Sequence, residues 1–265
     1  MKILSFFRTV IVTFWVVAVL AAPASGQTGL EIMKKAKDTN KSQDEQSNVK
    51  MILVDPQGNK KERKIVNYAK TDKSDLNKLL MRFLTPRDVE NTALLTWEQK
   101  GGDDDQWLYL PATGKPKRIA SSGKKNRFMG TDFSYEDLRP EPLDSYEYKL
   151  VGSENIDGKP CFVIEAFPKT DKEKQDSGYS KRKFWILKDT HFSLKREFYD
   201  KTGTLEKIEL SLDLKAIGGT LWRANTTEMQ DVRKKTKTFL VVENRKLNQG
   251  LSDQLFTERE LTKGK

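Results

Sequence analysis

Residues 207–214 read "KIELSLDL", a run in which apolar and polar side chains alternate. Successive side chains of a β-strand point to opposite faces, so this run predicts a strand with two unlike faces. The apolar face is expected to consist of Ile208, Leu210, Leu212 and Leu214. The opposite, polar face is expected to consist of Glu209, Ser211 and Asp213. Such a strand belongs in a sheet that covers its apolar face.

Similar segments recur on both sides of this run and are separated by turns such as Asp157-Gly158 and Gly218-Gly219. They include "NVKMILVD" (48–55), "LLMRFLTP" (79–86), "TALLTWEQ" (92–99), "QWLYLP" (106–111), "KPCFVIEAFP" (159–168) and "TKTFLVVENRKL" (236–247). Together they predict about eleven to thirteen strands in an antiparallel meander. No helical pattern is long enough to serve as a crossover between parallel strands, which argues against a nucleotide-binding parallel sheet.

Three short segments have helical character and are available to cover the sheet: residues 29–40, one turn near 134–139, and "SDQLFTERELT" at 252–262. The economical solution is a strongly curved sheet that short helices partly cover. This arrangement would leave an apolar groove between the sheet and its lid.

The N-terminus has the pattern of a secretory signal peptide. Lys2 and Arg8 precede the apolar run at 10–22, and Ala22-Pro23-Ala24 forms an A-x-A cleavage site. We expect a signal peptide at 1–24, with cleavage as late as 26, and a single domain at 25–265. Loss of Lys2 and Arg8 lowers the net charge from +10 to +8. A basic exported protein suits an anionic membrane surface, and the absence of a basic helix argues against nucleic acid.

Acidic clusters first suggest an enzyme, but each has a structural explanation. Residues 103–105 are three aspartates after Gly101-Gly102, as at a solvated hairpin tip. Ser134 and Asp137 fit the S-x-x-D pattern that caps a helical turn. A hydrolase that uses Asp132, Glu136 or Asp137 remains an alternative. We expect no catalytic residue, no metal site and no cofactor, because the chain lacks the corresponding motifs and has one His and one Cys.

One region resembles a known family over about 60 residues, from Met81 to Leu138. Its most specific pieces are "FLTP" (83–86), "WLYLP" (107–111), Arg118-Ile119 and "FMGTDFSYEDL" (128–138). They are similar to a divergent branch of the periplasmic outer-membrane lipoprotein-sorting proteins, the LolA-like superfamily. The resemblance implies a mainly β fold. It would be a large curved antiparallel sheet, an incomplete β-barrel of about 11 strands with short lid helices on its concave face.

The resemblance also implies a function. The protein would be a periplasmic carrier that binds acyl chains of lipoproteins or lipids in an apolar groove and moves them toward the outer membrane. Its partners would be that cargo, an anionic membrane surface and an inner-membrane transporter of the RND/MMPL or ABC type. The alternative on the same fold is an envelope-stress sensor or scaffold subunit without transport.

Candidate lipid-binding residues follow from strand alternation and from the segment at 126–138, expected to form a strap over the concave face. They are Leu79, Met81, Phe83, Leu95, Trp97, Trp107, Tyr109, Phe128, Met129, Phe133, Tyr135 and Leu138. Ala93 joins Leu95 and Trp97 on its strand, and Leu108 with Leu110 is the alternative to Trp107 with Tyr109. A register error of one residue would invert each choice.

Overall fold

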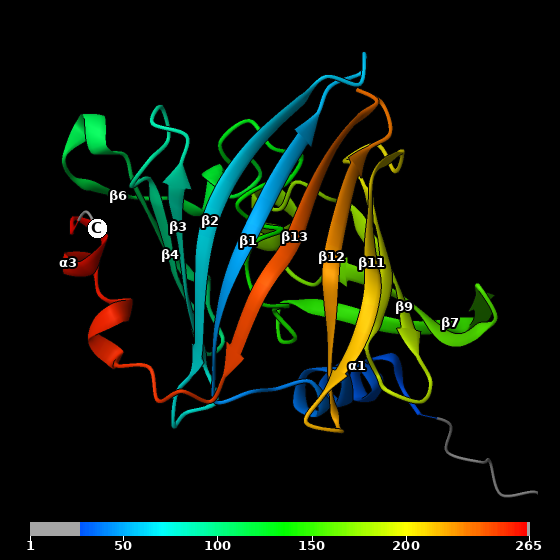
Figure 1. Ribbon diagram of the computed structural model, residues 1–265. Helices are drawn as coiled ribbons and strands as arrows, with labels where there is room; N and C mark the ends of the chain where they lie inside the picture. Colours follow the sequence, from blue (N-terminus) through cyan, green and yellow to red (C-terminus); the bar gives the residue numbers. More distant parts are fainter. Residues whose placement is uncertain (1–26, 264–265) are drawn as a thin grey trace, which may run out of the picture.

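A computed structural model describes residues 27–263 of the chain; the predicted signal peptide at 1–24 therefore lies outside the described residues. The described chain forms one curved antiparallel sheet of thirteen strands, with three short α-helices (Figure 1). This confirms the mainly β class and the open barrel, and the thirteen strands are at the upper end of the eleven to thirteen that the alternating segments predict.

The strands are β1 (Asp44–Val54), β2 (Lys60–Thr71), β3 (Asn77–Thr85), β4 (Ala93–Trp97), β5 (Asp105–Tyr109), β6 (Pro116–Arg118), β7 (Tyr146–Ile156), β8 (Lys159–Pro168), β9 (Lys181–Leu187), β10 (Ser193–Tyr199), β11 (Leu205–Ile217), β12 (Leu221–Asp231) and β13 (Thr236–Leu247). The helices are α1 (Gly29–Thr39), α2 (Asp171–Asp176) and α3 (Glu258–Leu261). Short 3-10 helices are η1 (Pro111–Thr113), η2 (Ser121–Gly123) and η3 (Asp253–Phe256).

The order of the strands explains why a segment crosses the inside of the sheet. The order is β6-β5-β4-β3-β2-β1-β13-β12-β11-β10-β9-β8-β7, so β6 and β7 are the two edges. These edge strands are consecutive along the chain, and residues 119–145 connect them. Phe128 and Tyr135 of this connection pack against inward-facing residues of β1 to β3, so the connection passes through the concave side. The residues at 126–138 lie within it.

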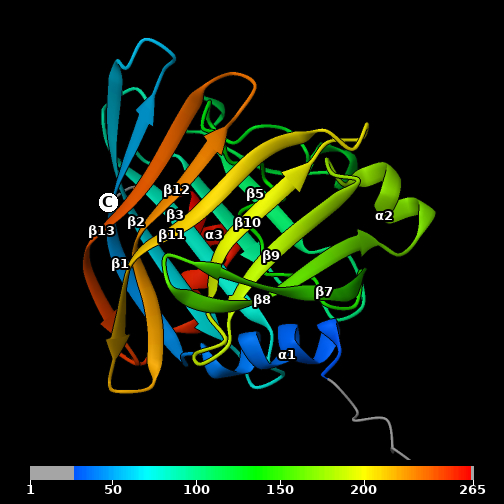
Figure 2. The same ribbon diagram turned by 90° about the vertical axis from the view of Figure 1, so that its right-hand side faces the viewer.

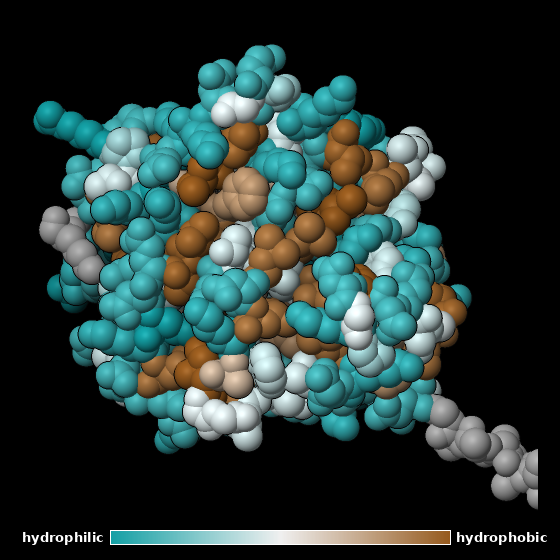
Figure 3. All heavy atoms as spheres, turned by 45° about the vertical axis from the view of Figure 1, so that its right-hand side comes forward, coloured by the Kyte–Doolittle hydropathy of each residue, from teal (hydrophilic) through white to brown (hydrophobic). Residues whose placement is uncertain are grey.

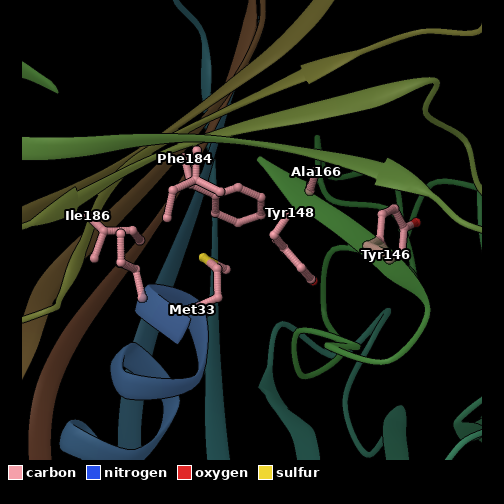
Figure 4. Packing of buried hydrophobic residues seen from close by; sticks show 8 residues of the cluster. Met33, Tyr146, Tyr148, Ala166, Phe184 and Ile186 are labelled. Atoms are coloured by element: carbon pink, nitrogen blue, oxygen red, sulfur yellow. The ribbon is translucent and has the colours of Figure 1, made fainter. Parts of the chain in front are cut away.

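Helix α1 closes one end of the concave side, beneath β8 and β9 (Figure 2). Thr28 caps the helix in a capping box with Glu31, which satisfies exposed N–H groups of the first turn. Ile32 and Met33 are buried and pack against the sheet residues Tyr148, Phe184 and Ile186. Figure 4 shows Met33 pointing from α1 toward these side chains. The helix predicted at 29–40 is thus confirmed.

The C-terminal helices lie on the outer face of the sheet (Figure 1). Thr257 divides the segment predicted at 252–262 into η3 and α3, and its side chain caps α3. Phe256 and Leu261 are buried against β2 to β5, together with Val66 and Leu80. This helical segment was expected as part of the lid on the concave face, and that expectation is wrong.

Strand β11 places two of its charged side chains, Lys207 and Glu209, inside, against the prediction from "KIELSLDL". Lys207 and Glu209 are buried, at 3% and 4% exposure. Leu212 is 40% exposed on the outer face, and apolar side chains form rows across this face in Figure 3. The inversion is possible because ion-pair partners for Lys207 and Glu209 lie on the concave side.

Candidate functional site

Residues 126–138, which we call the strap, form a compact loop against the inner face of the sheet. Phe128 N donates to Phe133 O, and the chain reverses at Met129 and Gly130, whose φ angles are +47° and +74°. Phe128 is fully buried, with its ring centroid 5.8 Å from that of Phe83 and 5.6 Å from that of Tyr135. The predicted strap over the concave face therefore exists.

The strap residues divide between two clusters of the inner face. Phe128 and Tyr135 belong to a cluster with Val49, Ile65 and Phe83, against which Met129 packs in a half-buried position. Phe133 belongs to a second cluster with Tyr179, Phe198 and Met229. Leu138 contacts both clusters. The strap thus connects the β1–β3 side of the interior with the β10–β12 side.

Three buried carboxylates attach the strap to distant parts of the sheet. Asp132 accepts hydrogen bonds from Arg127 Nη1 at 2.9 Å and from Thr238 Oγ1 at 2.8 Å. Glu136 accepts from Tyr146 Oη, Ser177 Oγ and Gly178 N at 2.6–3.0 Å. Asp137 Oδ2 lies 2.9 Å from Lys207 Nζ and also accepts from Ser134 N, as the capping pattern predicts.

The environment of Asp137 favours its charged form. Burial alone would raise the pKa of this carboxyl, but Lys207, Ser134 N and the Tyr179 hydroxyl lower the pKa below its usual value. The side chain of Asp137 has no exposed surface, and that of Lys207 is 4% exposed. This buried pair gives the carboxylate a structural explanation, as do the hydrogen bonds of Asp132 and Glu136.

Two adjoining cavities lie beside the strap on the concave side. The larger, of about 530 Å³, lies between α1, residues 133–143 and strands β9 to β13. The smaller, of about 300 Å³, lies under β1 to β4 and is bordered by Leu79, Met81 and Leu94. Leu138 and Leu240 border both cavities. Together they form the groove, and each volume is within the range of about 300–1,000 Å³ that is typical of ligand sites.

The two cavities differ in polarity. The smaller is lined mainly by aliphatic and uncharged polar side chains, and among the described residues Glu45 is its one charged lining residue. The larger has an apolar wall from α1 and β9, including Met33 and Phe184, and also a charged wall. That charged wall contains Arg196, Glu209, Glu141, Arg223 and Arg245. The groove is therefore amphipathic, which alternation along single strands did not predict.

The structure separates the predicted lipid-binding residues into two groups. The inner group lies on the concave side of the sheet. Four of its members line the two cavities: Leu79, Met81, Phe133 and Leu138. The other four pack in the inner-face cluster beside the cavities without lining them: Phe83, Phe128, Met129 and Tyr135. The outer group is covered by the C-terminal helices and comprises Leu95, Trp97, Trp107 and Tyr109, with Ala93. Trp97 Nε1, for example, donates to Phe256 O at 2.8 Å. The side chains of β4 and β5 that were predicted to face the groove therefore lie on the outer face, so this prediction is wrong.

The residues that face inward from β4 and β5 are Leu94 and Leu108, which contact the strap cluster. Leu95 pairs with Leu80 and Trp107, which are all on the outer face. Sequence reasoning missed this register because "ALLTW" is apolar on both faces. The C-terminal helices η3 and α3 bury the outer face of β4 and β5 as well. The polarity of the side chains therefore does not show which face of these strands is the inner one.

Arg82 lies on the outer face of β3 and contacts the C-terminal helix α3. Its guanidinium donates to Glu260 O at 2.7 Å and to Leu261 O at 3.3 Å. Burial lowers the pKa of this group, whereas nearby Glu260 raises it. Arg82 therefore holds α3 on the outer face, where it satisfies carbonyl groups at the end of the helix.

The three aspartates at 103–105 suggested a solvated hairpin tip, but for Asp104 that prediction is wrong. Its side chain is 4% exposed and lies 3.8 Å from Arg139, just beyond the strap. Burial raises the pKa of Asp104 to about 6, although Arg139 acts in the opposite direction. The folded protein consequently keeps a proton on this carboxyl that the unfolded chain releases near the usual value of 3.8.

This shift predicts a loss of stability as the pH rises. The folded state binds more protons than the unfolded state between pH 3.8 and about 6. The free energy of unfolding of the unmodified protein, relative to Asp104→Asn, should therefore fall by roughly 2–3 kcal/mol between about pH 3.5 and 7. Urea unfolding of both proteins at several pH values measures this difference. A constant difference would contradict the assignment.

Among residues 27–263, no helix combines the length and apolarity needed to cross a membrane. The same residues contain no group of three or more His, Cys, Asp or Glu side chains suited to hold a metal ion. Cys161 is buried in an apolar cluster with Val163 and Trp185.

The sequence and the fold are similar to those of known proteins. A family model described as "Uncharacterized protein" matches residues 75–263. A putative outer membrane lipoprotein-sorting protein domain from Vibrio parahaemolyticus is 33% identical, with a TM-score of 0.83 over 89% of this chain and 98% of that chain. A DUF1329 family protein from Desulfovibrio piger is 32% identical, with a TM-score of 0.81 over 88% and 97%.

A third structure shares the fold at lower identity. A LolA superfamily protein from Nitrosomonas europaea is 21% identical, with a TM-score of 0.69 over 89% of this chain and 100% of that chain. No curated protein matches the sequence.

Proposed function

Because the chain belongs to the LolA-like outer-membrane lipoprotein-sorting proteins, we propose that it is a periplasmic carrier for the acyl chains of lipoproteins or lipids. In this proposal the signal peptide directs export, an inner-membrane transporter of the RND/MMPL or ABC type supplies the cargo, and the loaded carrier moves toward the outer membrane. The observation that carries the proposal is the groove of two adjoining cavities beside the strap.

The energetics suit reversible loading. Burial of a C16 chain stabilises the complex by on the order of 10 kcal/mol, at about 0.8 kcal/mol per CH₂, before ordering costs are subtracted. The strap and α1 already pack their own apolar side chains against the walls of the groove. Acyl chains must displace part of this packing, which lowers their net affinity and permits release.

The proposed lipid-binding residues are the inner group, with Leu94 and Leu240 added. Leu240→Trp should weaken the binding of a fluorescent fatty acid at least about tenfold. Leu240 borders both cavities, so the bulkier indole ring of Trp would fill their junction. Leu212→Trp is the matched control, since Leu212 lies on the outer face. Equal affinities of the two variants would contradict the assignment of the groove.

Lipid transfer separates a carrier from a sensor or scaffold subunit. The purified protein is extracted with organic solvent and analysed by mass spectrometry, and it is then tested for transfer of a fluorescent acyl lipid between donor and acceptor vesicles. A carrier should contain extractable lipid and accelerate transfer. If no lipid is extracted and no acyl probe binds, the carrier proposal fails; binding without transfer would favour the sensor or scaffold.

A further inference from the structure

Two arginines of the larger cavity and one carboxylate of the adjoining smaller cavity form a group with one more positive than negative charge. Arg223 Nε and Arg245 Nε bind the same carboxylate, Glu45, at 2.8 and 2.7 Å. The three side chains are only 11–16% exposed. Within residues 27–263, no second carboxylate lies within ion-pair distance of either guanidinium. We call these three residues the arginine pair site.

The other contacts of the two guanidinium groups do not neutralise this charge. Arg223 also donates to Asn40 O, Trp222 O and Ser42 Oγ. Arg245 also donates to Asn225 Oδ1 and Ala224 O. These oxygens are uncharged acceptors. A largely buried cation without an equal counter-charge is unfavourable, so the site favours an anion from a ligand.

Unused polar atoms also line the larger cavity. His191 is 6% exposed and borders the larger cavity, and its Nε2 has no hydrogen-bond partner among the described residues. The hydroxyl of Ser193, two residues further along, is also buried and unpaired. Burial and the proximity of Lys35 lower the pKa of His191, so its imidazole is neutral near pH 7. It and Ser193 can each donate one hydrogen bond.

Asn40 brings these groups together at the end of α1. Its side-chain Nδ2 donates to Thr190 O and His191 O at 3.4 and 3.3 Å. Its backbone carbonyl oxygen accepts from Arg223 Nη1 at 2.8 Å. The turn before β10 and the start of β12 therefore meet beside this helix end. Unpaired buried donors are rare in folded proteins, and two of them on the wall that also carries an uncompensated cation can donate to the anionic group of a ligand.

We propose that the arginine pair site, His191 and Ser193 bind the anionic headgroup of a lipid whose acyl chains occupy the apolar part of the groove. This inference rests on the proposed carrier function and narrows its cargo to lipids with a phosphate or carboxylate headgroup. The N-terminus of an acylated lipoprotein offers amides instead of a phosphate or carboxylate at this position. Arginine suits the anionic group because its planar guanidinium matches carboxylate and phosphate oxygens.

The test compares ligands that share acyl chains but differ in their polar end. Fluorescent phosphatidate, fluorescent diacylglycerol with the same chains, a synthetic triacylated lipopeptide and inorganic phosphate are titrated into the purified full chain. Phosphatidate should bind about tenfold more tightly than diacylglycerol or the lipopeptide. Inorganic phosphate alone should not bind measurably, because the acyl chains supply most of the affinity.

Variants assign the preference to the site. Arg223→Gln should weaken phosphatidate binding about tenfold and leave diacylglycerol binding unchanged, whereas Glu45→Gln should strengthen phosphatidate binding. Ser193→Ala, which removes an unpaired hydroxyl and should fold normally, should weaken phosphatidate binding about threefold. Arg233→Gln is the control, because Arg233 is 53% exposed and pairs with Asp200 and Glu206. Thermal unfolding of each variant verifies its fold.

The outcomes separate this inference from the carrier proposal. Equal binding of phosphatidate and diacylglycerol, or a preference for the lipopeptide, would overturn the headgroup site while the carrier function stands. Tight binding of inorganic phosphate alone would also overturn it, in favour of a free-anion site. If none of the acyl ligands binds, the carrier proposal itself fails. A phosphatidate preference that Ser193→Ala and Arg223→Gln do not reduce would likewise exclude this site.

Discussion

Replacement of Asp137 by Asn should lower the free energy of unfolding by about 3–5 kcal/mol. The substitution leaves the ammonium of Lys207 buried without a charged partner, 4% exposed beneath the strap. It also weakens the hydrogen bonds from Ser134 N and the Tyr179 hydroxyl. Urea unfolding followed by tryptophan fluorescence measures the change, since the chain contains five tryptophans.

Two variants test whether the buried pair is responsible for that loss. Asp171→Asn is the control, because the side chain of Asp171 is fully exposed in its pair with Lys174, so the substitution should leave the free energy of unfolding nearly unchanged. The double variant Asp137→Asn with Lys207→Met should recover part of the stability, since it removes the unpaired charge. A loss below about 1 kcal/mol for Asp137→Asn would show that the pair does not stabilise the fold.

Phe128→Ala should have an effect of similar size, about 3–5 kcal/mol, because it creates a cavity in the inner cluster. The ring of Phe128 is fully buried between Phe83 and Tyr135, so its loss affects both neighbours. Acyl binding should also change, since the strap would no longer be held against β3. Urea unfolding and titration with a fluorescent fatty acid measure the two effects.

Met129→Ala is the matched comparison from the next position of the strap. Met129 is only half-buried, and its carbonyl oxygen, which accepts from Arg63 Nη1, is retained in the variant. We expect a loss of about 1 kcal/mol. If both variants leave stability and acyl binding unchanged, the strap is a sequence marker of the family without a role in the groove.

The strap shows which structural features its sequence pattern predicted and which it did not. Its apolar residues predicted packing over the concave face, and Ser134 with Asp137 predicted a capped turn, as the structure has. The pattern did not predict that the same carboxylate binds Lys207, 70 positions away. Nor did it predict that the strap joins the two edges of the sheet, because that follows from the strand order.

The groove was predicted only in part. The inward direction of Leu79, Met81 and Phe83 agrees with alternation along β3. The direction was inverted in β4 and β5, because both of their faces are buried and neither is marked by charge. The arginine pair site was missed entirely, since Glu45, Arg223 and Arg245 are on three separate strands.

By itself, the sequence determined the period-two pattern, the short turns and the helical stretch at 29–40, and with them the antiparallel sheet. Only the tertiary structure decided which face is inside. In β11 it buried Lys207 and Glu209 and left Leu212 exposed. The physical reason is that alternation reveals two unlike faces but not their direction. The cost of burying a charge depends on partners such as Asp137 and Arg196, which only the folded chain brings close.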